Sequence, residues 1–246
     1  MADREFPVQG ALRAGILAVV LALGGCAGPT MTTKWGSEWA THDVTLSLEE
    51  LRRDKVQGRT DIVFRLRATG VPKGVPLLLW HKSRGERPVR VPGVYIADDG
   101  RLTSVKDRQE AELHAWGLAR GEAYDLGVAA EDGTVRAFIK ATPFPLEARG
   151  PGGVRVWAEL ASARGDAWIV NGEGFRMAEE INTVMTAGDE VHLDVVIASP
   201  TGTFSRVLFP VAWFHQPDGT AGWKATSKSG SVELSLGWGA HAMRTE

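Results

Sequence analysis

The chain has 246 residues, of which 43% are hydrophobic and 24% charged, a composition typical of a folded protein with one large core or two small ones. Lys and Arg total 28 against 30 for Asp and Glu, so the formal net charge is -2. This composition excludes widespread disorder, and the balance of charge gives no electrostatic reason to expect nucleic acid as a partner.

The first 25 residues have the features of an export signal. Arg4 and Arg13 precede an uncharged apolar run at residues 14–23. A run of about ten residues is too short to cross a hydrocarbon core of about 30 Å as a helix, which favours a signal peptide over a stable membrane span. The run ends in Leu23-Gly24-Gly25-Cys26, which resembles the lipobox of bacterial lipoproteins.

This resemblance implies that residues 1–25 are removed, that Cys26 carries lipid, and that residues 26–40 are a tether. Several acyl chains on Cys26 would hold the protein to a membrane, where one chain alone is marginal. Cys26 is the only cysteine, so no disulfide within the chain is available to stabilise the fold. The alternative is an ordinary small-residue cleavage site that contains a cysteine. Ala27 in place of an aspartate favours the outer membrane, if the organism has one.

The remaining sequence predicts an antiparallel β protein. Residues 61–67, 134–140 and 191–197 show the alternation of a strand with one face in a core and one in water. Turns that contain Asp and Gly, at residues 98–100, 131–133 and 217–219, supply the positive φ of tight hairpins. Residues 48–55 are the one segment with a local helical pattern, because Leu48 and Leu51 stand among charged neighbours.

Proline and glycine interrupt this pattern near the middle of the chain, at residues 143–145 and 149–153. Proline cannot donate a hydrogen bond to a strand ladder, so we expect a domain boundary there. The predicted domains span residues 41–148 and 149–246, and each has the size of an immunoglobulin-like β-sandwich.

Three segments share a short pattern of glycine, an apolar residue and a small residue before a strand, which suggests an internal repeat; they are residues 70–74, 117–121 and 174–178. The stretch from Gly174-Phe175 through Glu179 to Gly202-Thr203-Phe204 resembles bacterial immunoglobulin-like domains. In that family a Gly-Phe-x-x-Gly-Glu corner precedes a strand, and an Asp-x-Gly-x-Phe turn opens the next hairpin. Ala178 replaces the second glycine of the corner here, and Pro200-Thr201 replaces the aspartate of the turn. The resemblance implies architecture more than activity.

The sequence has no recognisable hydrolase, metalloprotease or phosphate-loop motif. His192 and Asp194 share one face of a predicted strand, but two ligands do not make a zinc site, and a solvated pair is the plainer interpretation. The neighbours Glu179-Glu180 and Asp189-Glu190 are likewise interpreted as turn carboxylates rather than an acid and base couple. We therefore predict no catalytic residue, no metal and no cofactor.

Nine tryptophans beside two tyrosines are the unusual feature of the composition. Exposed indoles stack on sugar rings, so Trp168, Trp213 and Trp223 are candidate ligand contacts for a glycan. The alternative is that large aromatic residues fill a core that lacks disulfides. On that basis we expect at least three of the five tryptophans in the second half to be buried; they are Trp157, Trp168, Trp213, Trp223 and Trp238.

These features predict a non-enzymatic, lipid-anchored cell-envelope protein that acts as a structural or protein-interaction module. The alternative is a lipoprotein that binds glycan or cell wall through exposed tryptophans. A third hypothesis, an enzyme with a dispersed site, requires titratable groups that converge in a pocket. The expected partners are the membrane, through Cys26, and an envelope protein or a glycan.

Overall fold

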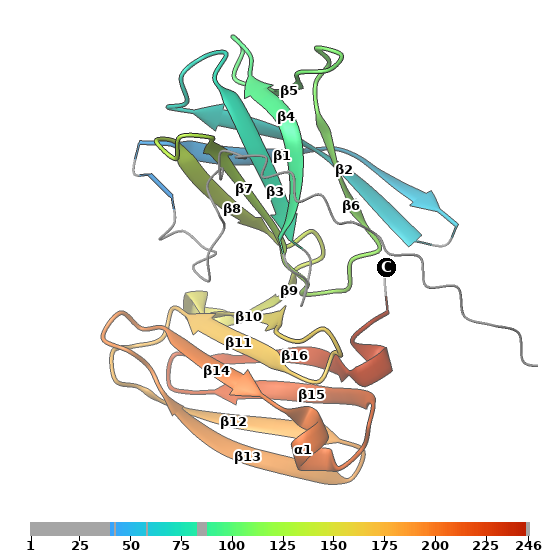
Figure 1. The fold of residues 1–246 in the computed structure, drawn as a ribbon. Helices are drawn as coiled ribbons and strands as arrows, with labels where there is room; N and C mark the ends of the chain where they lie inside the picture. Colours follow the sequence, from blue (N-terminus) through green and yellow to red (C-terminus); the bar gives the residue numbers. More distant parts are fainter. Residues whose placement is uncertain (1–39, 42, 58, 83–87, 245–246) are drawn as a thin grey trace, which may run out of the picture.

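The computed structural model describes residues 40–41, 43–57, 59–82 and 88–244. The predicted signal peptide, Cys26 and all but the last residue of the predicted tether lie outside these residues, as do Trp35 and Trp39. The structure is an all-β protein of two immunoglobulin-like antiparallel sandwiches (Figure 1).

The first sandwich packs two sheets around one core. β1, β2 and β6 form one sheet, and the other has the order β5-β4-β3-β7-β8. Leu66 of β2 and Leu126 of β7 are completely buried between them. The strands are β1 (Thr45–Val56), β2 (Arg59–Thr69), β3 (Pro76–Lys82), β4 (Val89–Ile96), β5 (Leu102–Ser104), β6 (Glu112–Trp116), β7 (Tyr124–Ala130) and β8 (Arg136–Ala141).

The second sandwich has sheets in the orders β14-β11-β10-β9 and β13-β12-β15-β16. Its core is built around Val170, Ile181 and Leu236, which are completely buried. The elements are β9 (Leu146–Arg149), η2 (Pro151–Gly153), β10 (Arg155–Leu160), β11 (Trp168–Glu173), β12 (Glu180–Ala187), β13 (Glu190–Ile197), β14 (Phe204–Leu208), α1 (Pro210–Phe214), β15 (Gly219–Thr226), β16 (Ser231–Trp238) and η3 (Gly239–His241).

The two sandwiches follow the same path through their sheets. The order β1-β2-β6 corresponds to β10-β11-β14, and β4-β3-β7-β8 corresponds to β13-β12-β15-β16. β5 and β9 are additions at the sheet edges. The chain therefore contains one topology twice, with different edge strands.

Two of the three repeated sequence segments occupy equivalent places. Gly70 follows β2 and Gly174 follows the corresponding strand β11, and both have positive φ, 78° and 83°. A Cβ on either glycine would lie within 2.5 Å of a backbone oxygen two residues before β1 or β10, that of Asp43 or Gly153. The segment at Gly117 differs, because it lies between β6 and β7.

The helix expected at residues 48–55 is wrong, because these residues belong to β1. β1 pairs with β2 along its whole length, and its register shifts between Glu50 and Arg52. The bulge inserts Leu51 and breaks the two-residue alternation. The resulting three-residue spacing of Leu48 and Leu51 resembles a helix turn in the sequence.

The expected strands at residues 61–67 and 191–197 lie within β2 and β13, and the one at 134–140 overlaps β8. The expected turns at Gly100 and Gly133 have positive φ, 80° and 73°. Gly219 differs, because it begins β15 and its φ is not positive. Glycine is required there because the Trp238 ring lies 2.5 Å from where a Cβ would be.

The turn between β6 and β7 joins the two sandwiches. The Gly121 N–H donates to the Phe144 carbonyl at 2.8 Å, and the Gly121 carbonyl accepts from the Leu160 N–H of β10 at 2.9 Å. Ala119 of this turn is part of the second core. The expected division after residue 148 falls within β9, whose residues pair with β10 and so belong to the second sandwich.

Gly121 has φ +71°, and a Cβ would lie 2.7 Å from Cζ3 of Trp168 and 2.8 Å from the Ala158 oxygen. We expect Gly121→Ala to lower the free energy of unfolding by about 1–2 kcal/mol for the left-handed backbone and by about 1–3 kcal/mol more for overpacking. Urea unfolding followed by tryptophan fluorescence measures this loss.

Gly133→Ala is the matched control, because Gly133 has φ +73° and open space around its Cβ position. It should show only the backbone part of the loss. Equal losses for the two variants would contradict the proposed close contact at the junction.

Candidate interaction site

The structure buries two of the three tryptophans predicted to contact ligand. Trp168 of β11 is 1% exposed and Trp223 of β15 is 2% exposed. The Trp168 indole N–H donates to the Gly237 carbonyl at 2.7 Å, and the Trp223 ring contacts that of Phe204. Both residues occupy inward positions of their strands, so the prediction that they contact a glycan is wrong.

Trp213, the third predicted contact, lies on α1 and is half-buried. Its ring stacks on the imidazole of His192, with 4.0 Å between ring centroids and 10° between the planes. Asp194 pairs instead with Arg206 of β14 at 2.7 Å. His192 and Asp194 therefore each have a separate partner.

Of the five tryptophans in the second half, Trp168, Trp223 and Trp238 are buried, as expected from their role in a core without disulfides. Trp157 is half-buried beneath Arg155, whose guanidinium lies 4.8 Å from its ring centroid. Among the described residues, Trp116 of β6 is the most exposed tryptophan, at 44%. A planar row of indoles for a sugar is thus not formed by the described residues.

The most exposed apolar surface lies on β13. Four aliphatic side chains alternate along it and are between 50% and 70% exposed; this aliphatic ladder consists of Val191, Leu193, Val195 and Ile197. β13 is at the edge of its sheet and pairs only with β12 within the described residues. Contiguous exposed apolar side chains on a folded domain are typical of a contact surface for another molecule.

The orientation of β13 is the reverse of what its hydrophobic pattern predicts. His192 and Asp194 lie on the inward face, opposite Met185 and Thr183 of β12, while the aliphatic ladder points to solvent. A register shift of one residue would bury the ladder, at about 1.5–3 kcal/mol for each fully buried side chain. The hydrophobic pattern alone would place the ladder inward, and the observed orientation depends on the inward contacts of His192 and Asp194, which the alternation of residues 191–197 does not show.

The edge of β13 is partly closed to a further strand. The Asp194 carboxylate accepts a hydrogen bond from the Val195 N–H at 2.8 Å, and the Asp194 carbonyl accepts one from the Thr183 hydroxyl at 3.1 Å. Inward charges and occupied backbone groups at an edge oppose strand addition. The aliphatic side chains, rather than the strand backbone, are therefore the surface that β13 offers.

Glu179 connects two turns beside this strand. Its carboxylate accepts from the Arg176 N–H at 2.9 Å, from the Ser229 N–H at 2.8 Å and from the Ser229 hydroxyl. These hydrogen bonds, chiefly that of the Ser229 hydroxyl, lower the pKa of Glu179 to about 2. Ala178 has φ +56°, a conformation that glycine would adopt freely. The Glu179 carboxylate therefore ties this corner to the turn at Ser229.

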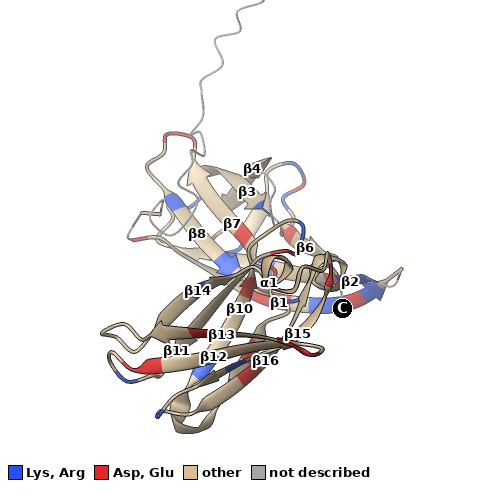
Figure 2. Ribbon diagram, turned by 90° about the horizontal axis from the view of Figure 1, so that it is seen from below, with Lys and Arg blue, Asp and Glu red and all other residues tan. Residues whose placement is uncertain are grey.

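The outer face of β1, β2 and β6 carries charges of both signs, some of which are visible along β1 and β2 in Figure 2. Arg52 pairs with Glu112 at 3.1 Å, and Arg65 pairs with Glu49 at 3.3 Å and also with Glu110. Exposed ion pairs of this kind contribute about 0–1 kcal/mol each. Because these charges are paired with charges of opposite sign, they give this face no strong net attraction for a polyanion or a polycation.

Within the described part of the chain, no group of three or more His, Cys, Asp or Glu side chains is arranged to hold a metal ion. None of the helices among these residues has both the length and the apolar character needed to span a membrane.

We expect the stability contributed by the Glu179 carboxylate to be fully present above pH about 4.5, its ordinary pKa, and to be lost as the pH falls towards 2. The sign follows because the folded state binds this proton more weakly than the unfolded state. Urea unfolding of the wild type and Glu179→Gln between pH 2 and 7 should give a difference that grows with pH. Ser229→Ala should lessen the pH dependence, and a pH-independent difference for Glu179→Gln would contradict the assignment.

No family model and no curated protein matches the chain. Among solved structures, it is similar to a tetra-tandem repeat in the extending region of a large adhesion protein. The alignment has a TM-score of 0.28 and 15% identity, covers 80% of this chain and spans about half (48%) of that one. At this score the likeness carries no conclusion about the present chain.

Proposed function

We propose that the chain is a non-enzymatic interaction module of the cell envelope that binds a partner protein through the aliphatic ladder of β13. The observation that carries this proposal is the row of four aliphatic side chains, 50–70% exposed, on the outward face of an edge strand. Their solvent-facing orientation leaves apolar surface available for burial in a complex.

The chemistry of the surface favours a protein over a glycan. Sugar rings are bound by flat aromatic faces with polar groups beside them, and the ladder contains only branched aliphatic side chains. Trp168 and Trp223 are buried and Trp213 is stacked on His192, so these three residues do not support the glycan alternative. An apolar surface on the partner would complement Leu193 and its neighbours.

The size of the ladder limits the affinity that it can supply. Because the four aliphatic side chains are 50–70% exposed, burying the rest of them contributes about 4–7 kcal/mol, and association costs about 4–15 kcal/mol in lost freedom and ordering. Additional contacts are therefore needed for a stable complex. Met177, in the turn before β12, is 70% exposed and is a further apolar side chain on the second sandwich.

A lipid on Cys26 would restrict the module to a membrane surface. The support for this part of the proposal is the sequence Leu23-Gly24-Gly25-Cys26 after a short apolar run. Restriction to a surface raises the effective concentration of a weakly binding module near partners in the same membrane.

We expect labelled palmitate to be incorporated into the wild-type chain in a bacterial host and to be absent from Cys26→Ala. The cysteine is the only one in the chain, so the label reports on a single thiol and the amine beside it. Cys26→Ser serves as a second variant that keeps the size of the side chain. Label retained in either variant, or absent from the wild type, would overturn the lipid anchor.

The protein contact is tested by placing a photo-crosslinking amino acid at Leu193 in cells that naturally produce the chain. We expect one adduct of defined mass, containing a different protein, because Leu193 is 70% exposed at the centre of the ladder. The matched control is the same probe at Glu233, which is exposed on β16 at the opposite edge of the same sheet. It should give no adduct.

Val195→Lys should reduce the Leu193 adduct at least tenfold, because burying an unpaired ammonium in an apolar contact is costly. Thr226→Lys adds the same charge at an exposed site on β15 and should leave the adduct unchanged. Equal adducts at Leu193 and Glu233, or none at either, would refute the docking surface. An adduct of twice the chain's mass would replace the proposed partner with a second copy of the chain.

A further inference from the structure

We propose that residues 35–39 of this chain pack over the outer face of the five-stranded sheet and cover an apolar cluster there. This outer cluster consists of Leu78, Trp80 and Ala129, which form a hydrophobic group separate from both cores. Phe138 packs against it and is partly buried. The surface belongs to the first sandwich, so the inference does not depend on the function assigned to the aliphatic ladder of β13.

The outer cluster points away from the core of the first sandwich. Leu77 and Leu79 of β3 belong to that core. Because successive side chains of a strand point to opposite faces, Leu78 and Trp80 lie on the outer face of the sheet. Ala129 of β7 is opposite Leu78 in the register, and its two neighbours along the strand belong to the core. The three residues therefore form one outward patch on two adjacent strands (Figure 1).

This outward patch is nevertheless buried. Leu78 is 2% exposed, Trp80 is 5% exposed and Ala129 is completely buried. Within the described part of the chain, Phe138 of β8 is the partly buried hydrophobic residue that packs against the cluster, and it lies two strands away from Trp80. Burial of a large indole and its neighbours on the outer face indicates a further segment lying over them. The single chain supplies this burial, so the segment belongs to the same chain.

The sequence identifies which segment can supply an apolar cover. The residues after Thr41 that lie outside the described ranges include no aliphatic residue, methionine, phenylalanine, tyrosine or tryptophan; they are residues 42, 58, 83–87 and 245–246. On the N-terminal side, Trp39 and Trp35 are the large apolar residues nearest to Thr41. An aromatic side chain of this kind buries about 150–250 Å². The two indoles therefore provide the apolar area that the outer cluster requires.

The chain enters the described structure at the edge of this same sheet. The Thr41 N–H donates to the Arg136 carbonyl of β8 at 2.7 Å, and the Thr41 hydroxyl donates to the same oxygen at 2.9 Å. Arg136 is opposite Ala129 of the cluster. With strands about 4.8 Å apart, the cluster on β7 and β3 lies about 10–15 Å from Thr41. An extended chain advances about 3.3 Å per residue, so Trp39 and Trp35 lie at most about 7 and 20 Å from Thr41, and together they span this distance.

This packing shortens the tether that the sequence predicts. Residues 27–34 alone then connect the packed segment to Cys26, over at most about 30 Å. With a lipid on Cys26, the first sandwich is held close to the membrane surface. The packing itself does not require the lipid, so failure of the lipid anchor and failure of this inference are separate results.

The test places the aromatic photo-crosslinker benzoylphenylalanine at Trp39 or Trp35 in the full chain, purified from a bacterial host and inserted in phospholipid vesicles. After irradiation and trypsin digestion, we expect mass spectrometry to find links to the peptides 74–82 and 137–140, which contain Trp80 and Phe138. Mixing with a nitrogen-15-labelled chain shows that the links are intramolecular. Adducts chiefly to lipid, or links between two chains, would overturn the packing.

The matched control is the same probe at Trp116, which is 44% exposed on the outer face of the other sheet of this sandwich. It should give no link to either peptide, and links as abundant as those from Trp39 would contradict the proposal.

Leu78→Asp should lower the yield of the Trp39 links at least fivefold, because a carboxylate opposes burial beneath an indole. Val105→Asp adds the same charge at a site that is 53% exposed and should leave the yield unchanged. Circular dichroism separates lost packing from lost folding in the two variants. The links of the otherwise unaltered chain decide the proposal by themselves, and their absence from both the Trp39 and the Trp35 probe would overturn it.

Discussion

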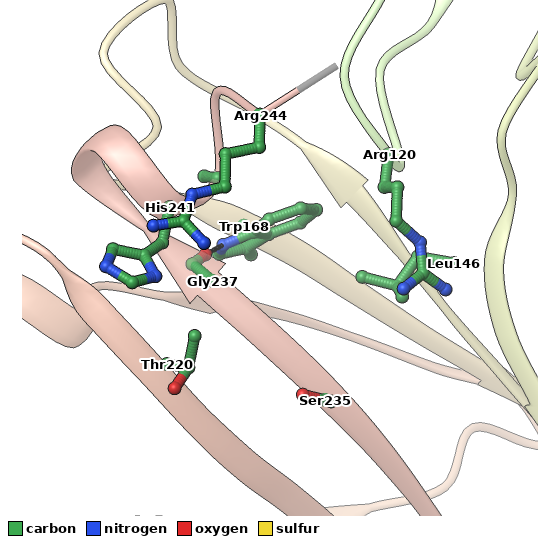
Figure 3. A pocket seen from close by; sticks show the side chains of 9 residues that line it. Arg120, Leu146, Trp168, Thr220, Ser235, Gly237, His241 and Arg244 are labelled. Atoms are coloured by element: carbon green, nitrogen blue, oxygen red, sulfur yellow. Dashed lines mark hydrogen bonds between the residues drawn. The ribbon is translucent and has the colours of Figure 1, made fainter. Parts of the chain in front are cut away.

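The contact between Gly121 and the indole of Trp168 is the constraint on which the arrangement of this molecule depends. A Cβ at Gly121 would lie 2.7 Å from the Trp168 ring, so the turn after β6 can approach β11 only because glycine has no side chain. The same turn places Ala119 in the second core. It also places Arg120 at a hollow of about 260 Å³, which Trp168 and Arg244 also line (Figure 3). One close approach therefore joins the two cores and completes the hollow.

The junction also explains why the two sandwiches differ at their edges although they share a topology. β9 pairs with β10 and lies next to the junction, while Lys140 of β8 forms an ion pair with Glu159 of β10 at 3.0 Å. The edge strand β13 lies in the other sheet of the second sandwich. The second sandwich thus uses one sheet to attach to the first and keeps the aliphatic ladder on the other sheet.

The aliphatic ladder shows how a polar interior can keep an apolar surface exposed. Asp194 is held inward by Arg206 at 2.7 Å, and His192 is held by the Trp213 ring at 4.0 Å. These two contacts oppose the one-residue register shift that would bury the ladder. Truncating Arg206 would leave Asp194 without its ion pair, and truncating Trp213 would leave His192 without its ring contact. The exposure of the ladder therefore depends on these two contacts on the inward face.

Several features of the fold followed from local chemistry and could be predicted from residues alone. The alternation at residues 61–67 and 191–197 indicated strands, and Gly100 and Gly133 take the positive φ expected of their turns. At the corner after Gly174, Ala178 has φ +56°, a conformation that glycine adopts freely. The lipid on Cys26 stays a prediction, because it depends on residues outside the described structure.

The sequence by itself determined the β class, the turns and the corner, because these depend on neighbours along the chain. Tertiary structure decided which face of each strand meets a core. That choice buried Trp168 and Trp223, turned the ladder of β13 to solvent, and made a bulge at Leu51 where local spacing suggested a helix. It also brought Arg120 and Arg244 to one hollow. Residues so far apart in the chain meet only through packing, which no periodicity of the sequence records.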